Sequence, residues 1–271
     1  MASQPDTYTH GHQDSVLRAH RWRTAENSAA YLLPHLRPGD RLLDVGCGPG
    51  TLTADLARRV APGQVTAVDV VAAVLGEAEA HALATGVANV IFTAGDFRDI
   101  GLPAASFDVV HAHQVLQHLR EPAGALEAMA RLAAPGGLVA AREAIYSAMT
   151  WAPESDRIAR WLDIYLAVTR RNGADANAGR WLLRWARAAG LTDVAYTTST
   201  WTFATAEDRA YWGGQWADRV VTSTFAEQAV AYGIATAAEL ADIAVGWREW
   251  LREPDGVFIA VHGEVVARVA E

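Results

Sequence analysis

An acid and three alternating glycines carry the clearest chemical signal in this sequence. Asp44 ends an apolar stretch, and Gly46, Gly48 and Gly50 follow it at every second position. Glycine is needed where the backbone takes a positive φ or lies against a ligand, because a Cβ would collide there. Thr51–Val60 then repeats apolar residues at helical spacing, so the glycines are predicted to form a strand-to-helix turn. Such a turn places a nucleotide-like cofactor at the carboxyl end of a strand in a doubly wound sheet.

The spacing and charge of this turn indicate which cofactor it binds. Dinucleotide-binding turns use the pattern G-x-G-x-x-G and offer the helix N-terminus to a pyrophosphate. Here the third glycine, Gly50, comes one residue early, and Asp44 would be a negative neighbour of a pyrophosphate. A cofactor with a positive charge and no phosphate suits the turn better. S-adenosylmethionine, with its sulfonium and α-amino groups, is such a molecule.

Acidic and aromatic residues at the ends of the next two predicted strands support this choice. A strand over residues 64–68 ends at Asp69, where a carboxylate can accept hydrogen bonds from both ribose hydroxyls. A strand over residues 90–94 leads into Asp96 and Phe97, a carboxylate and a ring that could contact the amino group and face of an adenine.

Five motifs in a fixed order resemble those of the class I S-adenosylmethionine-dependent methyltransferases. They are D-x-G-x-G-x-G, VDV, GDF, FDVV with VLQHL, and APGGL, and they extend over residues 36–144. The sequence looks most like the small-molecule branch (methyltransferase type 11) typified by the ubiquinone and menaquinone biosynthesis methyltransferases. The resemblance implies an α/β fold: a Rossmann-like sheet of seven strands with helices on both faces, an N-terminal helical lid and a helical insertion before the last strand.

The resemblance also implies roles for single residues. The residues expected to bind the cofactor follow the first four strands: Asp44, Gly46, Gly48, Gly50, Asp69, Val70, Asp96, Phe97, Ala112 and His113. Asp44 and the glycines would line the methionine part, Asp69 the ribose, and Asp96 with Phe97 the adenine. The last two residues of the set would lie nearest the sulfonium. Val70 and Val71 stand where such enzymes often have a polar residue.

Catalysis by such a site depends mainly on orientation. Methyl transfer from a sulfonium is an in-line displacement, so the enzyme gains most by aligning the nucleophile and excluding water. A base would help if the acceptor is a phenol, a hydroxyl or an acidic carbon, and histidine is best matched to neutral pH. We predict His113 as the first candidate base and His12 as the second, while His118 and Cys47 are expected to be structural.

Residues 1–35 are expected to fold over the cofactor as a lid. The stretch around Tyr8, His10 and His12 concentrates aromatic and histidine side chains, so we expect Tyr8 and His12 to contact the substrate. A solvated tail is the alternative. His10 and His12 have no carboxylate or cysteine partner nearby, and no metal site is predicted.

The core is expected to span residues 36–150, and residues 151–271 complete the same domain with a helical cap at about residues 204–254. Nine of the ten tryptophans lie at or after Trp151. Each alone is best explained by core packing, but as a group they favour a sizeable apolar or aromatic substrate beneath the cap. Trp151 directly follows the exit of the fifth strand, and we predict that it contacts the substrate and is the tryptophan that lies closest to the cofactor.

Composition limits the remaining classes. The chain has 271 residues, 51% of them hydrophobic, which is enough for one large α/β core and an added element. Interrupted apolar residues, a single cysteine and no signal pattern predict a soluble cytoplasmic protein without a membrane partner. The net charge of −8 argues against a nucleic-acid partner. All 23 basic residues are arginine, which suggests a GC-rich, bacterial genome and removes lysine as a base.

Two other functions stay open beside methyl transfer to a small molecule. One is an S-adenosylmethionine-binding enzyme of the same fold that catalyses a cyclisation or elimination. The other is an NAD-dependent oxidoreductase, which the position of Gly50 disfavours. The acceptor, its methylated atom and the oligomeric state are not predicted, because these properties depend on the shape of a pocket and not on motifs.

Overall fold

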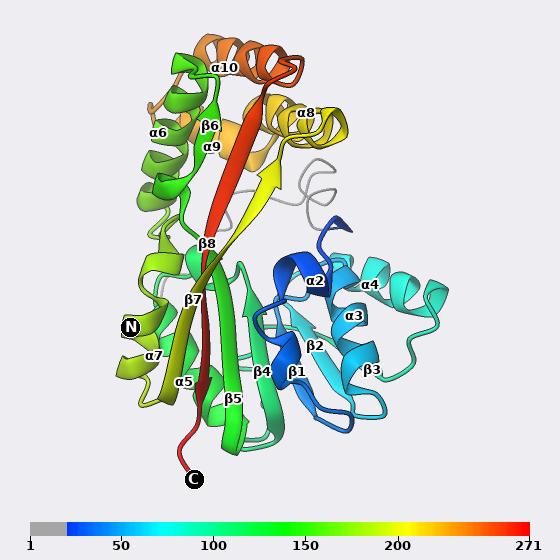
Figure 1. Cartoon of the computed structure of the whole chain (residues 1–271). Helices are drawn as coiled ribbons and strands as arrows, with labels where there is room; N and C mark the ends of the chain where they lie inside the picture. The colour runs from blue at the N-terminus through cyan, green and yellow to red at the C-terminus, as the bar shows by residue number, and fades with distance from the viewer. Residues whose placement is uncertain (1–20) are drawn as a thin grey trace.

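A mixed sheet of eight strands forms the centre of the protein (Figure 1). The computed structural model describes residues 21–271, so the predicted contacts of Tyr8 and His12 and most of the predicted lid lie outside the described residues. The strands are β1 (Leu42–Val45), β2 (Val65–Asp69), β3 (Val90–Ala94), β4 (Phe107–His113), β5 (Ala133–Ala144), β6 (Thr150–Ala152), β7 (Thr192–Phe203) and β8 (Val257–Arg268).

The strand order is β3-β2-β1-β4-β5-β8-β6. Along β8, β5 and β6 pair with successive stretches of one edge, and β7 pairs with the opposite edge. The first five strands are parallel, and β8 runs antiparallel to β5, β6 and β7. The order reverses between β1 and β4, and ligands of open α/β sheets bind outside the carboxyl ends of the strands at such a point. The predicted α/β fold is confirmed, with one short strand, β6, added to the seven expected.

Helices cover both faces of the sheet because the parallel strands are apolar on both sides. Figure 1 shows α2, α3 and α4 on one face and α5 and α7 on the other. Their bounds are α2 (Ala25–Ser28), α3 (Thr51–Val60), α4 (Ala72–Ala84), α5 (Pro122–Leu132) and α7 (Leu182–Ala188). In α3, for example, Leu52, Leu56 and Val60 recur at helical spacing and pack against the sheet.

Four more helices form a cap at one end of the sheet (Figure 1). They are α6 (Asp156–Arg171), α8 (Ala206–Thr222), α9 (Thr224–Ala231) and α10 (Ala237–Trp250). The last three lie between β7 and β8, which confirms the predicted helical insertion before the last strand. The strands β7 and β8 pair from Thr192 with Arg268 up to Phe203 with Phe258, so they run from the sheet into the cap.

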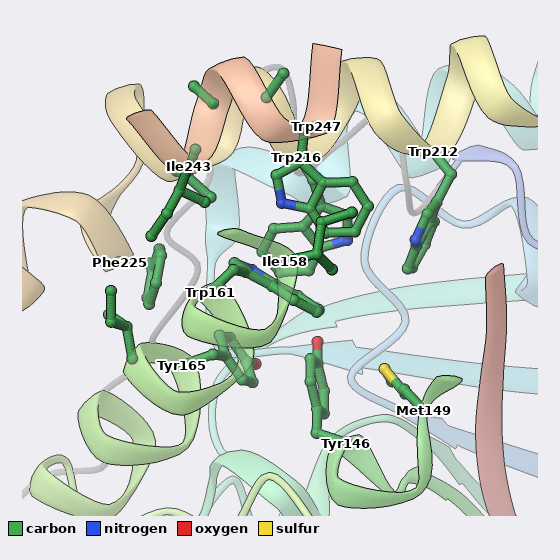
Figure 2. Close-up of a cluster of buried hydrophobic side chains, with 14 of the residues drawn as sticks. Tyr146, Met149, Ile158, Trp161, Tyr165, Trp212, Trp216, Phe225, Ile243 and Trp247 are labelled. Carbon is green, nitrogen blue, oxygen red and sulfur yellow. The ribbon is translucent and has the colours of Figure 1, made fainter. Parts of the chain in front are cut away.

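An aromatic cluster fills the cap (Figure 2). Trp161, Trp216 and Trp247 are fully buried. The ring centroid of Trp161 lies 4.4 Å from that of Trp216 and 5.1 Å from that of Trp247. Such edge-to-face contacts add to the stability that burial provides. Most of the C-terminal tryptophans therefore hold the cap together, as core packing predicts for each one alone.

Among the helices between residues 21 and 271, none combines the length and the apolar character that crossing a bilayer requires.

Removing a ring from this cluster tests its role in the fold. We expect Trp161→Ala to lower the free energy of unfolding by about 3 to 5 kcal/mol, because it leaves a large cavity among rigid rings. Trp181→Ala is the control, since Trp181 is 38% exposed and donates one hydrogen bond to Asp175, and it should cost about 1 kcal/mol. Urea unfolding of the two variants measures both values. Equal losses would contradict a cap that depends on the aromatic cluster.

Candidate active site

A cavity of about 1020 Å³ opens where the strand order reverses, at the carboxyl ends of β1, β2 and β4. Eight of the ten residues predicted to bind the cofactor line it: Asp44, Gly46, Gly48, Asp69, Val70, Asp96, Phe97 and His113. Ala112 and Gly50 do not. Neighbouring residues of a strand point to opposite faces, so His113 faces the cavity and Ala112 packs in the core with α5. Ala112 does not line the cavity, and its contact with the cofactor stays a prediction.

The glycine turn has the backbone that its sequence predicts. Gly46, Gly48 and Gly50 have φ values of +70°, +54° and +78°. A Cβ on Gly46 would overlap the side chain of Val115. A Cβ on Gly50 would lie 2.7 Å from Cβ of Ala78 in α4. Gly50 therefore lets α3 and α4 approach each other, and it does not line the cavity.

Asp44 is buried and held in one orientation. Its Oδ2 accepts a hydrogen bond from Oγ1 of Thr53 at 2.6 Å, and its Oδ1 lies 2.9 Å from Nδ1 of His111, which donates. Each carboxylate oxygen can accept a second hydrogen bond. Asp44 can therefore receive a positively charged or N–H-bearing group from the cavity without moving.

Asp69 ties together the two loops that border the cavity. Its Oδ2 accepts from the backbone N–H of Gly48 at 3.0 Å, and its Oδ1 accepts from that of Val71 at 2.9 Å. Between these loops the side chain of Val70 is 70% exposed. The carboxylate at the end of β2 is thus fixed by backbone donors and keeps acceptor capacity toward the cavity.

Asp96 forms an ion pair that the sequence analysis missed. Nε of Arg98 donates to its Oδ1 at 2.9 Å and to its Oδ2 at 3.1 Å, and both residues line the cavity. The sequence does contain a local signal for this ion pair, since an arginine two residues after an acid can reach back to it. Phe97, between the two, is buried, packs into the core and also lines the cavity.

His113 is a buried, neutral histidine that faces the cavity. Within residues 21–271, neither ring nitrogen has a hydrogen-bond partner. Burial lowers the pKa of His113 well below its usual value, and the positive charges of Arg23 and Arg142 lower it further. The ring is therefore uncharged at neutral pH and can exchange hydrogen bonds with a ligand.

Gln114 joins three parts of the chain beside the cavity. It has a φ of +53°, which is uncommon for a residue other than glycine. Its Oε1 accepts from Nη2 of Arg23 at 2.6 Å, and its Nε2 lies 2.9 Å from Nε2 of His262 in β8. No sequence signal could have found this bridge, because its partners are 91 and 148 residues away. Backbone strain of this kind is often found at functional sites.

Glu143 fixes the segment that follows Gln114. Its carboxylate accepts from the backbone N–H groups of Val115, Leu116 and Gln117 at 3.0, 2.8 and 3.2 Å. Burial raises the pKa of Glu143 to about 7, although these three N–H groups oppose the rise. The sequence analysis missed this residue, for which the only signal was the charged pair of Arg142 and Glu143 near the end of a mostly apolar strand.

A second, smaller chamber of about 30 Å³ lies between the large cavity and the cap. It shares Arg23, Gln114 and His118 with the large cavity. Its other described lining residues come from the segment before α2, the turn after β4, the segment from the end of β5 to β6, the strands β7 and β8, and the cap: Trp22, Gln117, Ala144, Tyr146, Met149, Trp201, Tyr211, Trp212, Arg219, Ala260 and His262. Figure 2 shows Tyr146, Met149 and Trp212 at the border of the aromatic cluster.

Trp151 corrects another prediction. It lies in β6, pairs with Phe258 of β8 and stacks on that ring with centroids 6.0 Å apart. It lines neither cavity. The short strand β6 carries Trp151 into the cap, whereas Trp22, Trp201 and Trp212 are the tryptophans that reach the chamber.

Cys47 shows no sign of thiolate chemistry. Burial and the negative charges of Asp44 and Asp69 raise the pKa of the Cys47 thiol far above its usual value. Cys47 is therefore a neutral thiol, as predicted for a structural residue. The part of the chain that the structure describes contains no group of three or more residues arranged to hold a metal ion.

The raised pKa of Glu143 predicts how stability depends on pH. The unfolded carboxyl loses its proton near its ordinary value of 4.5 and the folded one near 7, so its contribution to stability is full below pH 4.5 and is lost as the pH rises through 7. Relative to Glu143→Gln, the wild-type protein should therefore lose about 2 to 3 kcal/mol of unfolding free energy between pH 5 and 8. Urea unfolding of both proteins at several pH values measures this difference, and parallel profiles would contradict it.

Comparison with known proteins agrees with this geometry. A family model described as a methyltransferase domain matches residues 36–170. An uncharacterized methyltransferase of Schizosaccharomyces pombe is 31% identical over 277 residues, which cover 97% of each chain. A ubiquinone biosynthesis O-methyltransferase of Hahella chejuensis is 38% identical over 131 residues, or 44% of this chain. The match spans about half, 54%, of that enzyme.

A solved structure extends the likeness over the whole fold. The cyclase SpnF superimposes with a TM-score of 0.53 and 22% identity, over 98% of this chain and 89% of its own. At this identity the likeness concerns the fold alone. The relative from Schizosaccharomyces pombe, by contrast, matches along nearly the full length of both sequences. The chain therefore belongs to the methyltransferase family.

Proposed function

We propose that the protein transfers a methyl group from S-adenosylmethionine to a small apolar or aromatic molecule. The observation that carries this proposal is the cavity at the point where the strand order reverses, in which the glycine turn meets two fixed carboxylates, Asp44 and Asp69. Membership of the methyltransferase family supports the reaction. The small acceptor is supported by the enclosed chamber next to this cavity.

The residues of the cavity fit this cofactor in volume and in charge. A cavity of about 1020 Å³ is larger than most sites for a single small ligand, so it has room for a cofactor and part of an acceptor. The acids Asp44 and Asp69 would attract a sulfonium and an α-amino group. Asp44, next to the glycine turn, would repel the pyrophosphate of NAD, which disfavours an oxidoreductase.

Individual contacts follow from the orientation of the side chains. Asp44, held by Thr53 and His111, would accept from the α-amino group, and Asp69 would accept from the ribose hydroxyls. Phe97 would cover one face of the adenine. Asp96 would accept from the adenine amino group while Arg98 keeps it in place.

The protein's own part in the reaction is to orient the acceptor and exclude water. S-adenosylmethionine, when bound, supplies a methyl group activated by the sulfonium. His113 would accept a hydrogen bond from the hydroxyl or other protonated group of the acceptor, because its ring is neutral and faces the cavity. Arg23 and Arg142 disfavour a lasting charge on this ring, so the proton would pass on to solvent. Tyr8 and His12, outside the described residues, remain proposed contacts of the acceptor.

A second candidate is an enzyme that binds the same cofactor but catalyses a cyclisation. It is favoured by the likeness to SpnF, which is described as a cyclase and matches almost the whole chain. The full-length relative is described as a methyltransferase, so methyl transfer is the better supported of the two.

Substitution of Asp69 tests the cofactor site. We expect Asp69→Asn to weaken the binding of S-adenosylhomocysteine by about 1.5 to 3 kcal/mol, because a charge-assisted acceptor is lost while the side-chain shape is kept. Asp108→Asn is the matched control, since Asp108 pairs with Arg41 at the opposite end of β4. Isothermal titration calorimetry measures both. Unchanged affinity of Asp69→Asn, or tight binding of NADH by the wild-type protein, would contradict the assignment.

Transfer of label tests the reaction itself. Wild-type protein, incubated with S-adenosylmethionine labelled in the methyl group and a small-molecule culture extract, is expected to give a labelled product. His113→Gln should reduce the rate at saturating S-adenosylmethionine at least about tenfold, because it removes a hydrogen bond to the acceptor. A product without label would favour the cyclisation.

A further inference from the structure

His111 supports Asp44 from the side away from the large cavity. The register of the parallel strands β1 and β4 places these two residues next to each other. Asp44 lines the cavity, whereas His111 is fully buried and lines neither the cavity nor the chamber. Thr53 of α3, the second donor to Asp44, is likewise fully buried and outside both linings. Both donors therefore hold the carboxylate from behind and do not cover the side that a ligand would reach.

The bond to Asp44 determines which nitrogen of His111 carries the proton. A carboxylate oxygen only accepts hydrogen bonds, so the proton lies on Nδ1, which is 2.9 Å from Oδ1 of Asp44. The other ring nitrogen, Nε2, is buried and has no hydrogen-bond partner among the described residues. An unpaired buried nitrogen lowers the stability of a fold. The bond from Nδ1 is therefore the favourable polar contact that this side chain supplies.

The two donors immobilise the carboxylate of Asp44. Burying a charged group is costly unless hydrogen bonds replace its contacts with water. Thr53 donates to one oxygen at 2.6 Å and His111 lies 2.9 Å from the other, so the carboxylate cannot rotate without losing a bond. A ligand that donates to Asp44 then meets an acceptor that is already oriented, and little further ordering is needed on binding.

We propose that His111 is a positioning residue for the cofactor, which through its bond to Asp44 strengthens the binding of the α-amino group. The inference rests on the proposed function, in which Asp44 accepts from this group. His111 itself does not line the cavity, so it acts only through the carboxylate. His113 follows two residues later on the same face of β4. One strand thus orients the cofactor through His111 and faces the acceptor with His113.

Two ligands that differ in their amino-acid part test this role. S-adenosylhomocysteine carries the α-amino group, and 5′-methylthioadenosine has the same nucleoside without the amino acid. We expect calorimetry to show that the wild-type protein binds S-adenosylhomocysteine at least about tenfold more tightly. His111→Leu should weaken the binding of S-adenosylhomocysteine about tenfold and change that of 5′-methylthioadenosine less than about twofold. A general loss of structure would weaken both ligands alike.

Two amides of different length identify the nitrogen that matters. In His111→Asn the amide nitrogen takes the place of Nδ1, so the affinity for S-adenosylhomocysteine should return to within about threefold of wild type. In His111→Gln the amide nitrogen reaches the place of Nε2, so this variant should bind S-adenosylhomocysteine as weakly as His111→Leu. It replaces His111→Leu in the comparison if the leucine variant does not fold.

Val109→Ala is the matched control. Val109 lies two residues before His111 on the same face of β4, is buried in the adjoining hydrophobic cluster and cannot hydrogen-bond to Asp44. Its substitution should lower the unfolding midpoint and leave the ratio of the two affinities unchanged.

Three results would overturn the inference. They are equal affinity of the wild-type protein for the two ligands, a loss in His111→Leu that affects both ligands alike or neither, and binding by His111→Asn that is as weak as that by His111→Gln. Failure of the wild-type protein to bind S-adenosylhomocysteine at all would instead count against the proposed function.

Discussion

The pairing of β7 with β8 is the constraint on which the rest of the structure depends. β8 pairs with β5 only from His262 onward, where its partner is Ala144. Nearer its start it pairs with β6, which takes the place of β5 in the sheet. β7 accompanies β8 along both stretches. The two strands thus carry the cap above the end of β5, and the small chamber lies where β5 stops and β6 has not yet begun.

Buried polar contacts also hold the strands together near the carboxyl end of β5. Besides the contacts of Asp44 and Glu143, Nε of Arg142 in β5 donates to Ser199 of β7 at 3.0 Å and to Glu264 of β8 at 3.1 Å. Burial lowers the pKa of Arg142 to about 10, although Glu264 opposes this. Burying such charges is costly unless each has partners. These contacts cross from strand to strand and set the relative positions of the residues around the cavity.

Local patterns predicted the cofactor side of the site well. The turn after Asp44 and the acid at the end of β2 each depend on a few consecutive residues, so their sequence determines where they lie. The core strands and the helices between β7 and β8 also follow from hydrophobic periodicity. Ala112 packs in the core while His113 lines the cavity, as the alternation of side chains along a strand requires.

The acceptor side was not predictable in the same way. Trp151 was expected near the cofactor because of its place in the chain, but pairing of β6 with β8 moves it into the cap. The bridge through Gln114 and the carboxylate of Glu143 depend on residues that meet only in the folded protein. Contacts of this kind leave no local signal in a single sequence.

The division of the protein into separate hydrophobic clusters has a consequence for its evolution. No residue of the aromatic cluster that fills the cap lines the large cavity. By contrast, four of its members also line the small chamber: Tyr146, Met149, Trp201 and Trp212. A lineage could therefore acquire a new acceptor without losing cofactor affinity. Changes at these four residues, however, would alter side chains that also hold the cap together, so adaptation through them would be limited by the stability of the cap.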